Sequence, residues 1–261
     1  MRVHLLGTGA AANECRYQAS LLVQSEDGSS QLLLDTGNGL DVVRRLTGAG
    51  LDPGQIEHVF VSHCHVDHAG GLEPLLLWRV FHDQGEPRVC VLAEAGVIAA
   101  LQQLFEAVST VVPRLYGERL QWRELVPDSS VQLNDNLRLL PFAVDHEPPG
   151  GGALGCVVDL DGMRIAYSGD TRPSSALAEA ASGVEVLFHE AGGLEADAEF
   201  IHMVGHSTAA DAGRAAAAAG AQRLVLTHFP SEQLIEPMLA EVRRSYDGPI
   251  EMALDGARVE V

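Results

Sequence analysis

Four metal-ligand side chains crowd into residues 62–71, which read Ser-His-Cys-His-Val-Asp-His-Ala-Gly-Gly. An apolar run typical of a buried strand precedes them. Alternate side chains of an extended segment share a face, so His63 and His65 are expected to point the same way. Asp67 and His68 follow where the chain turns, and the two glycines allow close approach of the backbone. Because imidazole and carboxylate suit zinc and similar ions, the segment predicts a metal site at a strand end.

The chain is long enough for one large domain, which we expect to span residues 1–261. Its start is strand-like, with no cationic region before a long apolar run, so we expect no signal peptide. No stretch approaches ~20 apolar residues, so we expect no membrane span. The four cysteines are far apart without Cys-x-x-Cys spacing, which favours reduced thiols and a cytoplasmic location.

The formal net charge is −19, and all 17 basic residues are arginine. This balance disfavours long polyanions as partners, because nucleic-acid binding depends largely on neutralising phosphates. A pair of metal ions would still supply strong local positive charge that the net count ignores.

Hydrophobic spacing and turn residues predict strands that alternate with helices. The expected strands are 3–6, 20–24, 31–34, 59–61, 88–92, 131–133, 137–142, 153–160, 163–167, 184–188, 224–226, 250–253 and 258–261. The expected helices are 40–46, 71–82, 94–108, a segment ending near 219 with Ser207 or Thr208 as N-cap, and 232–244. Residues 109–121 are expected to form a loop, since Pro113 and Gly117 interrupt them. This pattern alone indicates an α/β or α+β protein.

Further polar clusters lie just past predicted strands, where loops carry functional sites. They are Asp145-His146, Ser168-Gly169-Asp170-Thr171, His189-Glu190, Gly205-His206-Ser207-Thr208 and Thr227-His228. The small-residue segment 7–13 lacks the Lys of a P-loop, so we expect a tight active-site loop there. Asp35 ends a strand and has two compatible roles: N-cap of the next helix, or a partner that orients a ligand imidazole.

The His-x-His-x-Asp-His segment, followed by these clusters in this order, resembles the metallo-β-lactamase superfamily. Within it, the opening Leu-Gly-Thr-Gly and the later Leu-Leu-Leu-Asp-Thr-Gly resemble the ribonuclease Z-like phosphodiesterases. The resemblance implies an α+β fold: a four-layer αβ/βα sandwich of two mixed β-sheets with helices on the outer faces. It also implies two divalent metal ions, with zinc expected and manganese or iron also compatible with the ligands.

The resemblance assigns His63, His65 and His146 to one metal. It assigns Asp67, His68 and His228 to the other, Asp170 to a bridge between both, and Asp35 to the orientation of a ligand. In the family a His-Glu-Ala-Thr segment supplies a catalytic His and a Gly-His-Ser-Thr segment follows. Here the first reads His-Glu-Ala-Gly. The likeness implies catalytic roles for Asp67, His189, Glu190 and His206, with a shared metal-bound hydroxide as nucleophile.

Two departures bear on the substrate. Ribonuclease Z carries a long tRNA-gripping arm before the bridging Asp, but here only residues 147–169 separate His146 from Asp170. The family's Glu-Gly-Thr-Gln after the Asp-Thr-Gly segment is also missing. We therefore expect a phosphodiesterase for small or unstructured substrates, and not for structured nucleic acid, with a homodimer compatible with the sequence.

Three other functions stay open. An acyl hydrolase for a lactone or thioester would use the same ligands, and a tRNA 3′-processing endonuclease would need a partner for its grip. A non-catalytic binding subunit would be expected to have lost ligands, yet all seven are present.

Overall fold

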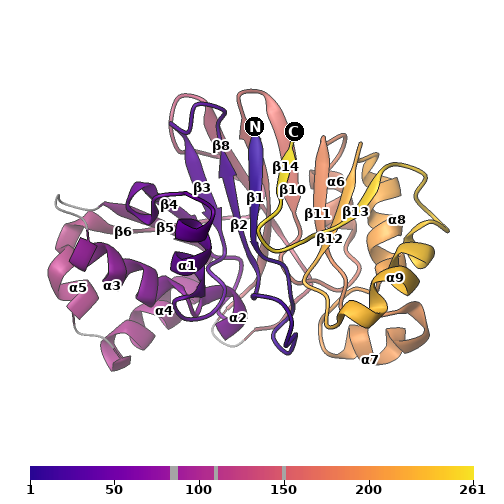
Figure 1. The fold of residues 1–261 in the computed structure, drawn as a ribbon, viewed down its shortest axis with the longest axis horizontal. Coiled ribbons are helices and arrows are strands. Elements are labelled where there is room, and N and C mark those ends of the chain that lie inside the picture. The colour runs from indigo at the N-terminus through magenta and orange to yellow at the C-terminus, as the bar shows by residue number, and fades with distance from the viewer. Residues whose placement is uncertain (83–87, 109–110, 149–150) are drawn as a thin grey trace.

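Two mixed seven-stranded sheets face each other in the computed structural model, which describes residues 1–82, 88–108, 111–148 and 151–261 (Figure 1). The first sheet has the order β14 (Arg258–Glu260), β1 (Arg2–Gly7), β2 (Ser20–Gln24), β3 (Gln31–Leu34), β4 (His58–Phe60), β5 (Val89–Ala93) and β6 (Leu120–Glu124). The second has the order β13 (Ile250–Met252), β12 (Leu224–Thr227), β11 (Val186–Glu190), β10 (Met163–Tyr167), β9 (Leu154–Leu160), β8 (Leu137–Ala143) and β7 (Val131–Gln132).

Helices cover the outer face of each sheet (Figure 1). The first sheet carries α1 (Asp41–Gly48), α3 (Leu72–His82), α4 (Ala95–Val108) and α5 (Val111–Tyr116), and the second carries α6 (Ser175–Ala180), α8 (Ala209–Ala219) and α9 (Ile235–Val242). The remaining helices are α2 (Val66–Ala69) and α7 (Ala198–Met203), with 3₁₀ turns η1 (Pro53–Gln55), η2 (Gly117–Arg119), η3 (Glu195–Asp197) and η4 (Glu232–Leu234). The expected four-layer αβ/βα sandwich is confirmed.

The strands are apolar on both faces because both faces are covered. Val3 pairs with Val23 and Leu5 with Leu21, and all four side chains lie in the core between the sheets. The alternate residues of the same strands, such as Leu22, pack against the outer helices. This explains why strands such as β2 are apolar runs without the alternation of a half-exposed sheet.

The predicted turn between β9 and β10 is also confirmed. Asp161 and Gly162 have φ values of 56° and 80°, as a two-residue hairpin turn requires. The antiparallel pairing runs directly up to this turn, with Met163 opposite Leu160.

The expectation of a loop over 109–121 is wrong for the described part of that segment; residues 109–110 lie outside the described residues. Residues 111–116 form α5, and β6 begins at Leu120. Pro113 is tolerated because it lies in the first turn, where backbone N–H groups have no helical acceptor. Gly117, at φ 54°, follows the helix in the left-handed region. Helices α6 and α7 were also not expected, since six residues give little periodicity to detect.

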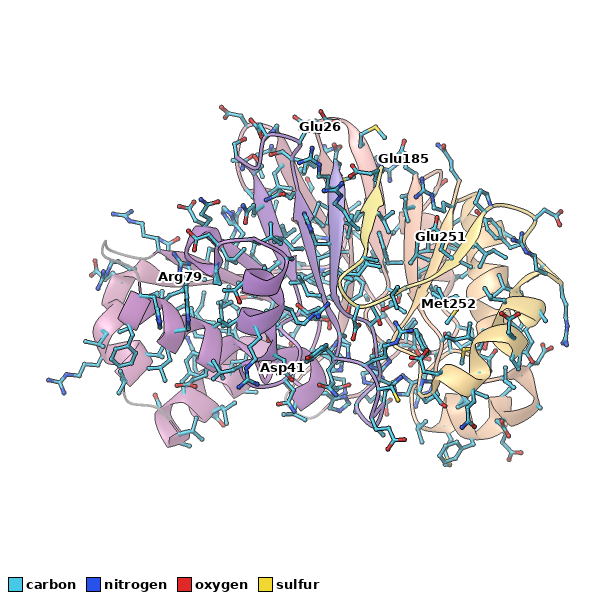
Figure 2. The ribbon with its side chains drawn as sticks, in the orientation of Figure 1. Glu26, Asp41, Arg79, Glu185, Glu251 and Met252 are labelled. Carbon is cyan, nitrogen blue, oxygen red and sulfur yellow. The ribbon has the colours of Figure 1, made fainter. Side chains whose placement is uncertain are left out.

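Arg79 on α3 illustrates how the outer layer is fixed (Figure 2). It is only 3% exposed, and its guanidinium donates to the carbonyl oxygens of Gly54, at 2.6 Å, and Ile56. A buried guanidinium needs such acceptors. This contact ties α3 to the turn before β4, the strand that leads into the histidine-rich segment.

Among the described residues, no single helix is both long and apolar enough to cross a bilayer. Only the bent pair Ala95–Val108 and Val111–Arg119 reaches that length and composition together, across a break of 102°.

Helix α8 begins at a capping box. Thr208 Oγ1 accepts from the Asp211 backbone N–H, and the Asp211 carboxylate accepts from the Thr208 backbone N–H. This confirms Thr208, of the two expected candidates, as the N-cap. Burial disfavours the charged carboxylate, but hydrogen bonds from His202, Thr208 and Arg214 hold the pKa of Asp211 at about 2.

We predict that Asp211→Ala lowers the free energy of unfolding at pH 7 by about 1–2 kcal/mol, the usual cost of losing a cap and its hydrogen bonds. The depressed pKa means that the wild type holds this stabilisation above about pH 4 and loses it as the pH falls through about 2. Urea unfolding of metal-free protein at pH 7 and pH 3 measures both effects. The exposed Asp247→Ala is the control, and equal midpoints for both variants at pH 7 contradict the prediction.

Candidate metal centre

The polar clusters meet at one edge of the sandwich. β3 and β4 of the first sheet, and β8, β10, β11 and β12 of the second, all end there, since β3–β4 and β10–β11–β12 are parallel pairs. β8 and β10 are each antiparallel to β9, so they also run the same way. Helix α2, which follows β4, lies at this edge between the sheets (Figure 1). Segments far apart in sequence thus deliver their side chains to one place.

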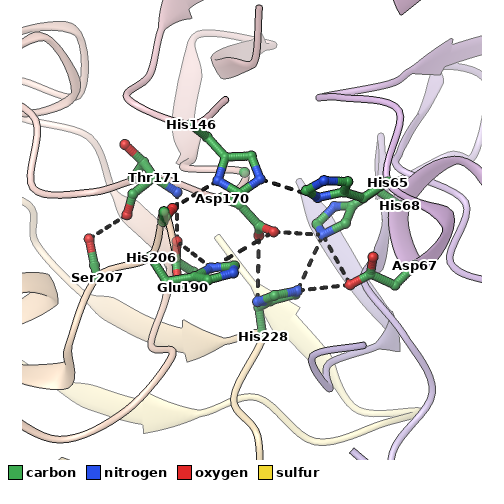
Figure 3. Close-up of polar contacts among 12 residues, drawn as sticks. His65, Asp67, His68, His146, Asp170, Thr171, Glu190, His206, Ser207 and His228 are labelled. Atoms are coloured by element: carbon green, nitrogen blue, oxygen red, sulfur yellow. Dashed lines mark hydrogen bonds and ion pairs between the residues drawn. The ribbon is translucent and has the colours of Figure 1, made fainter. Parts of the chain in front are cut away.

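One group of ligand atoms comes from His63, His65, His146 and Asp170, all within 4.8 Å of one another. His65 Nδ1 lies 3.0 Å from His63 Nε2 and 3.2 Å from His146 Nε2 (Figure 3). His63 Nε2 lies 3.6 Å from Asp170 Oδ2. The rings of His63 and His65 do converge, as their alternate spacing predicted.

A second group consists of Asp67, His68 and His228, again within 4.8 Å. His228 Nε2 lies 3.2 Å from both His68 Nε2 and Asp67 Oδ2. Asp170 reaches this group as well, with Oδ2 3.2 Å from His68 Nε2 and Oδ1 3.5 Å from His228 Nδ1 (Figure 3). The carboxylate of Asp170 therefore lies between the two groups.

Asp35 is fully buried and holds His68 in place. Its Oδ2 accepts from His68 Nδ1 at 2.8 Å, which turns His68 Nε2 toward the cluster. It also accepts from the Ser62 backbone N–H and hydroxyl and from the Tyr167 hydroxyl, each at 2.7 Å. The N-cap of α1 is Leu40 instead, without a side-chain hydrogen bond. Of the two roles considered for Asp35, the structure supports the partner of a ligand imidazole.

Gly205 orients the ring of His146, as Asp35 orients that of His68. The Gly205 carbonyl oxygen accepts from His146 Nδ1 at 2.8 Å, which leaves His146 Nε2 to face the cluster. Gly205 has φ 90°, and a Cβ there would lie 2.7 Å from His146 Nδ1. Glycine is required because the backbone must approach the ring this closely.

The surroundings shift the imidazole pKa values in opposite directions. Burial and the neighbouring imidazole of His68 lower the pKa of His63 well below its usual value. Burial also acts against charge on His68, but the carboxylates of Asp170 and Asp35 outweigh it and raise the pKa of His68 well above its usual value. The two carboxylates therefore favour the protonated form of His68, and metal binding would have to displace that proton.

The residues fit a pair of divalent ions. Asp170 Oδ1 and His228 Nδ1 are buried without a hydrogen-bond partner among the described residues, a state that is costly unless another group satisfies them. Imidazole nitrogens from different segments also face each other at 3.2 Å, in the pairs His68–His228 and His65–His146. Seven nitrogen and oxygen donors turned toward a common interior match the ligand types of zinc and similar ions.

A second polar pair lies beside the cluster. His206 Nδ1 lies 3.1 Å from Glu190 Oε2, and Glu190 Oε1 accepts from the Thr171 backbone N–H at 2.6 Å (Figure 3). Burial disfavours the imidazolium, but the charge and hydrogen bond of Glu190 raise the pKa of His206 to about 9. His206 also lies within 4.8 Å of ligand atoms of Asp170 and His228, so it is placed to act where the metals would act.

The structure does not bring His189 to this cluster. Val186 and Phe188 of β11 point into the core between the sheets, whereas Leu187 packs on the outer helices. By alternation His189 shares the outer face with Leu187, and Glu190 points inward. His189 is buried there, and its Nδ1 donates to the Glu190 carbonyl oxygen. Its position does not support the expected catalytic role, and in the described chain His206 is the imidazole beside the metal ligands.

Some features of the site left no signal in the sequence. Asp35 and His228 adopt φ values of 56° and 51°, which are unfavourable for non-glycine residues and typical of functional sites. In the sequence, Tyr167 does not differ from other strand residues. Only the structure shows that its hydroxyl donates to the Asp35 carboxylate. The loop over 7–13 does border the site, as expected: the His228 backbone N–H donates to the Thr8 carbonyl oxygen at 2.8 Å.

Comparisons with known proteins agree with this arrangement. Residues 30–229 match a family model described as Beta-lactamase superfamily domain. Ribonuclease Z of Myxococcus xanthus (strain DK1622) is 30% identical over 311 residues, which cover 100% of this chain and 98% of that protein. The alignment is longer than the 261 residues of this chain, so that relative carries segments that this chain lacks.

Solved structures share the fold. The metallo-beta-lactamase fold protein YhfI from Bacillus subtilis superposes with a TM-score of 0.82 at 21% identity, covering 99% of this chain and 98% of that one. The short form of human tRNase Z gives 0.78 at 23% identity, covering 100% and 99%. With a family model that spans most of its length and a donor set that fits two divalent ions, this chain belongs to the metallo-β-lactamase superfamily of hydrolases and has ribonuclease Z relatives.

Proposed function

We propose that this chain is a dinuclear metal-dependent phosphodiesterase that acts on small or unstructured diesters. The observation that carries the proposal is the position of the Asp170 carboxylate between the two ligand groups. Its Oδ2 lies 3.6 Å from His63 Nε2 of one group and 3.2 Å from His68 Nε2 of the other, and its Oδ1 lies 3.5 Å from His228 Nδ1. A carboxylate can bridge two ions in this way because each oxygen can bind one of them, whereas an imidazole in this arrangement cannot.

In this proposal His63, His65 and His146 hold one ion, Asp67, His68 and His228 hold the other, and Asp170 contacts both. We propose zinc as the native metal, with manganese or iron as substitutes that the same donors accept. When bound, such a pair polarises a phosphoryl group and lowers the pKa of water, which is the chemistry that diester cleavage needs.

The chain's own residues supply the proton transfers. Glu190 holds His206 through Nδ1, and the Thr171 backbone N–H fixes Glu190 in turn. Nε2 is then the nitrogen through which His206 can donate a proton to a departing alkoxide. Asp67 lies on the other side of His228 from His206, with its Oδ2 3.2 Å from His228 Nε2 (Figure 3). We propose that Asp67 accepts the proton of the attacking water.

A proton donor beside the candidate ligands favours substrates that are oxygen esters. An alkoxide leaves poorly without a proton, and a protonated imidazole also stabilises charge on phosphoryl oxygens. The pKa of His206, about 9, keeps it protonated at neutral pH in the metal-free chain. Bound metal ions would lower this pKa through their positive charge, toward the range useful for catalysis.

Three observations support a small substrate. A tight hairpin between β9 and β10 occupies the region where the ribonuclease Z family carries its arm. The ribonuclease Z relative is longer than this chain. The net charge of −19 works against a polyanion that needs many cationic contacts.

We predict that Asp170→Ala leaves fewer than two metal ions per chain and abolishes turnover, because both ions lose a ligand. Elemental analysis of purified protein measures the metal content. Asp145→Ala, an exposed carboxylate that precedes His146 and pairs with Arg172, is the control and should keep both ions. Two ions per chain in Asp170→Ala would show that Asp170 is not a bridge.

We also predict that His206→Ala keeps the metal content and lowers kcat by ~10²–10⁴-fold, as expected for a positioned acid. His189→Asn, on the far face of β11, should change kcat by less than about 3-fold, which is small compared with the loss expected for a positioned acid. Circular dichroism checks that both variants are folded. Loss of metal in His206→Ala would make His206 a ligand, and a large loss of rate in folded, metal-loaded His189→Asn would restore its catalytic role.

The substrate class is tested by comparing bis(4-nitrophenyl) phosphate, a simple lactone and a precursor tRNA at 50 and 200 mM salt, with and without chelator. We predict chelator-sensitive cleavage of the diester and little cleavage of the tRNA. Lactone turnover far above diester turnover would move the protein to the acyl hydrolases. Efficient cleavage of the precursor tRNA at its 3′ end would instead identify a tRNA-processing enzyme.

A further inference from the structure

The metal centre opens into a cavity of about 470 Å³ that both polar and apolar side chains line. The polar lining residues are His65, Asp67, Asp170, His206 and His228. The apolar lining residues, which we call the apolar wall, are Ala10, Ala11, Ala12, Val66, Phe200, Ile201, Val204 and Pro230. The cavity therefore joins reactive polar groups to a surface that offers no hydrogen bonds from side chains.

The apolar wall is built from four separate segments: the loop after β1, the start of α2, α7 with the residue that follows it, and the loop after β12. Three of its large side chains are open to solvent, with Val66 63%, Phe200 59% and Val204 42% exposed, whereas Ile201 is buried. Single exposed apolar residues are common and need no explanation. Three that border one cavity, directly beside reacting groups, form the kind of surface that binds an apolar ligand.

The charges around the cavity disfavour a second anionic group at this wall. Among the described residues, none that lines the cavity is an arginine, and the sequence contains no lysine. Arg16 is paired with Glu232, and Arg172 with Asp145. A further phosphate of a nucleotide chain would lie against methyl and phenyl groups without a cation, at a cost in desolvation.

We infer that the substrate is a phosphodiester with an uncharged apolar group, aryl or alkyl, on the ester oxygen that is not cleaved, and that this group packs on the apolar wall. Phe200 and Val204 select the substrate by contact with that group. The inference rests on the proposed phosphodiesterase function and adds the identity of the second ester substituent. The apolar wall also keeps water away from the reacting phosphate once the substituent covers it.

The test uses three diesters that share 4-nitrophenol as leaving group and carry methyl, phenyl or thymidine 5′-yl as the second substituent. Because the leaving group is constant, differences in kcat/KM report on the second substituent. We expect the phenyl ester to exceed the methyl ester by at least ~10-fold, mostly through KM, since even one methylene in an apolar pocket discriminates ~10–200-fold. The thymidine ester should fall below the phenyl ester.

Phe200→Ser and Val204→Ser should reduce the phenyl-to-methyl ratio of kcat/KM several-fold while the metal content stays unchanged. Phe81→Ser is the matched control, because Phe81 is 72% exposed on α3 and does not line the cavity. It should leave the ratio unchanged.

The outcomes separate the two claims. Cleavage of the methyl ester with a ratio near 1, a preference for the thymidine ester, or equal ratios in Phe200→Ser and Phe81→Ser overturns the inference and leaves the phosphodiesterase function intact. Chelator-sensitive cleavage of none of the three diesters overturns the proposed function, and the inference falls with it.

Discussion

The buried carboxylate of Asp35 connects the fold to the site. It accepts hydrogen bonds from His68, from the backbone N–H and hydroxyl of Ser62, and from Tyr167, at 2.7–2.8 Å. Ser62 and His68 follow β4 of the first sheet, whereas Tyr167 ends β10 of the second. Charge-assisted bonds of this kind are strong, and losing the acceptor would leave buried donors unsatisfied. One side chain, held at the unfavourable φ of 56°, therefore fixes the position of His68 and links the two sheets at this edge.

The buried carboxylates near Asp35 explain why this site would bind metal ions. Asp67, Asp170 and Glu190 are buried at one edge of the sandwich, among imidazoles. Hydrogen bonds from His206 and the Thr171 backbone satisfy Glu190, but Asp170 Oδ1 has no such partner within the described chain. Buried carboxylates of this kind are stable only when paired or bound to cations. The same geometry that is costly without a cation would make metal binding favourable, and it couples metal affinity to the stability of the fold.

Much of this could be predicted from the sequence, and the failures have physical causes. The strands were predictable because both faces are buried and the runs are apolar. The gathering of the candidate ligands at one edge was predictable because His and Asp recur just past those strands. Helix α5 was not predictable, because a proline such as Pro113 indicates a helix break unless it is known to lie in the first turn. His189 and Glu190 are adjacent, and which of them faces the metals depends on the register of β11. Gly205 and Tyr167 act through contacts across the molecule, of which local sequence carries no trace.

In the proposed site, two ions share the carboxylate of Asp170. Anomalous diffraction from crystals of zinc-loaded protein, collected on either side of the zinc absorption edge, would locate these ions. We expect two peaks ~3.5–4 Å apart, one next to His63, His65 and His146, the other next to Asp67, His68 and His228, with Asp170 between them. A single peak at full loading, or a second peak away from Asp170, would show that the two ions do not share this carboxylate.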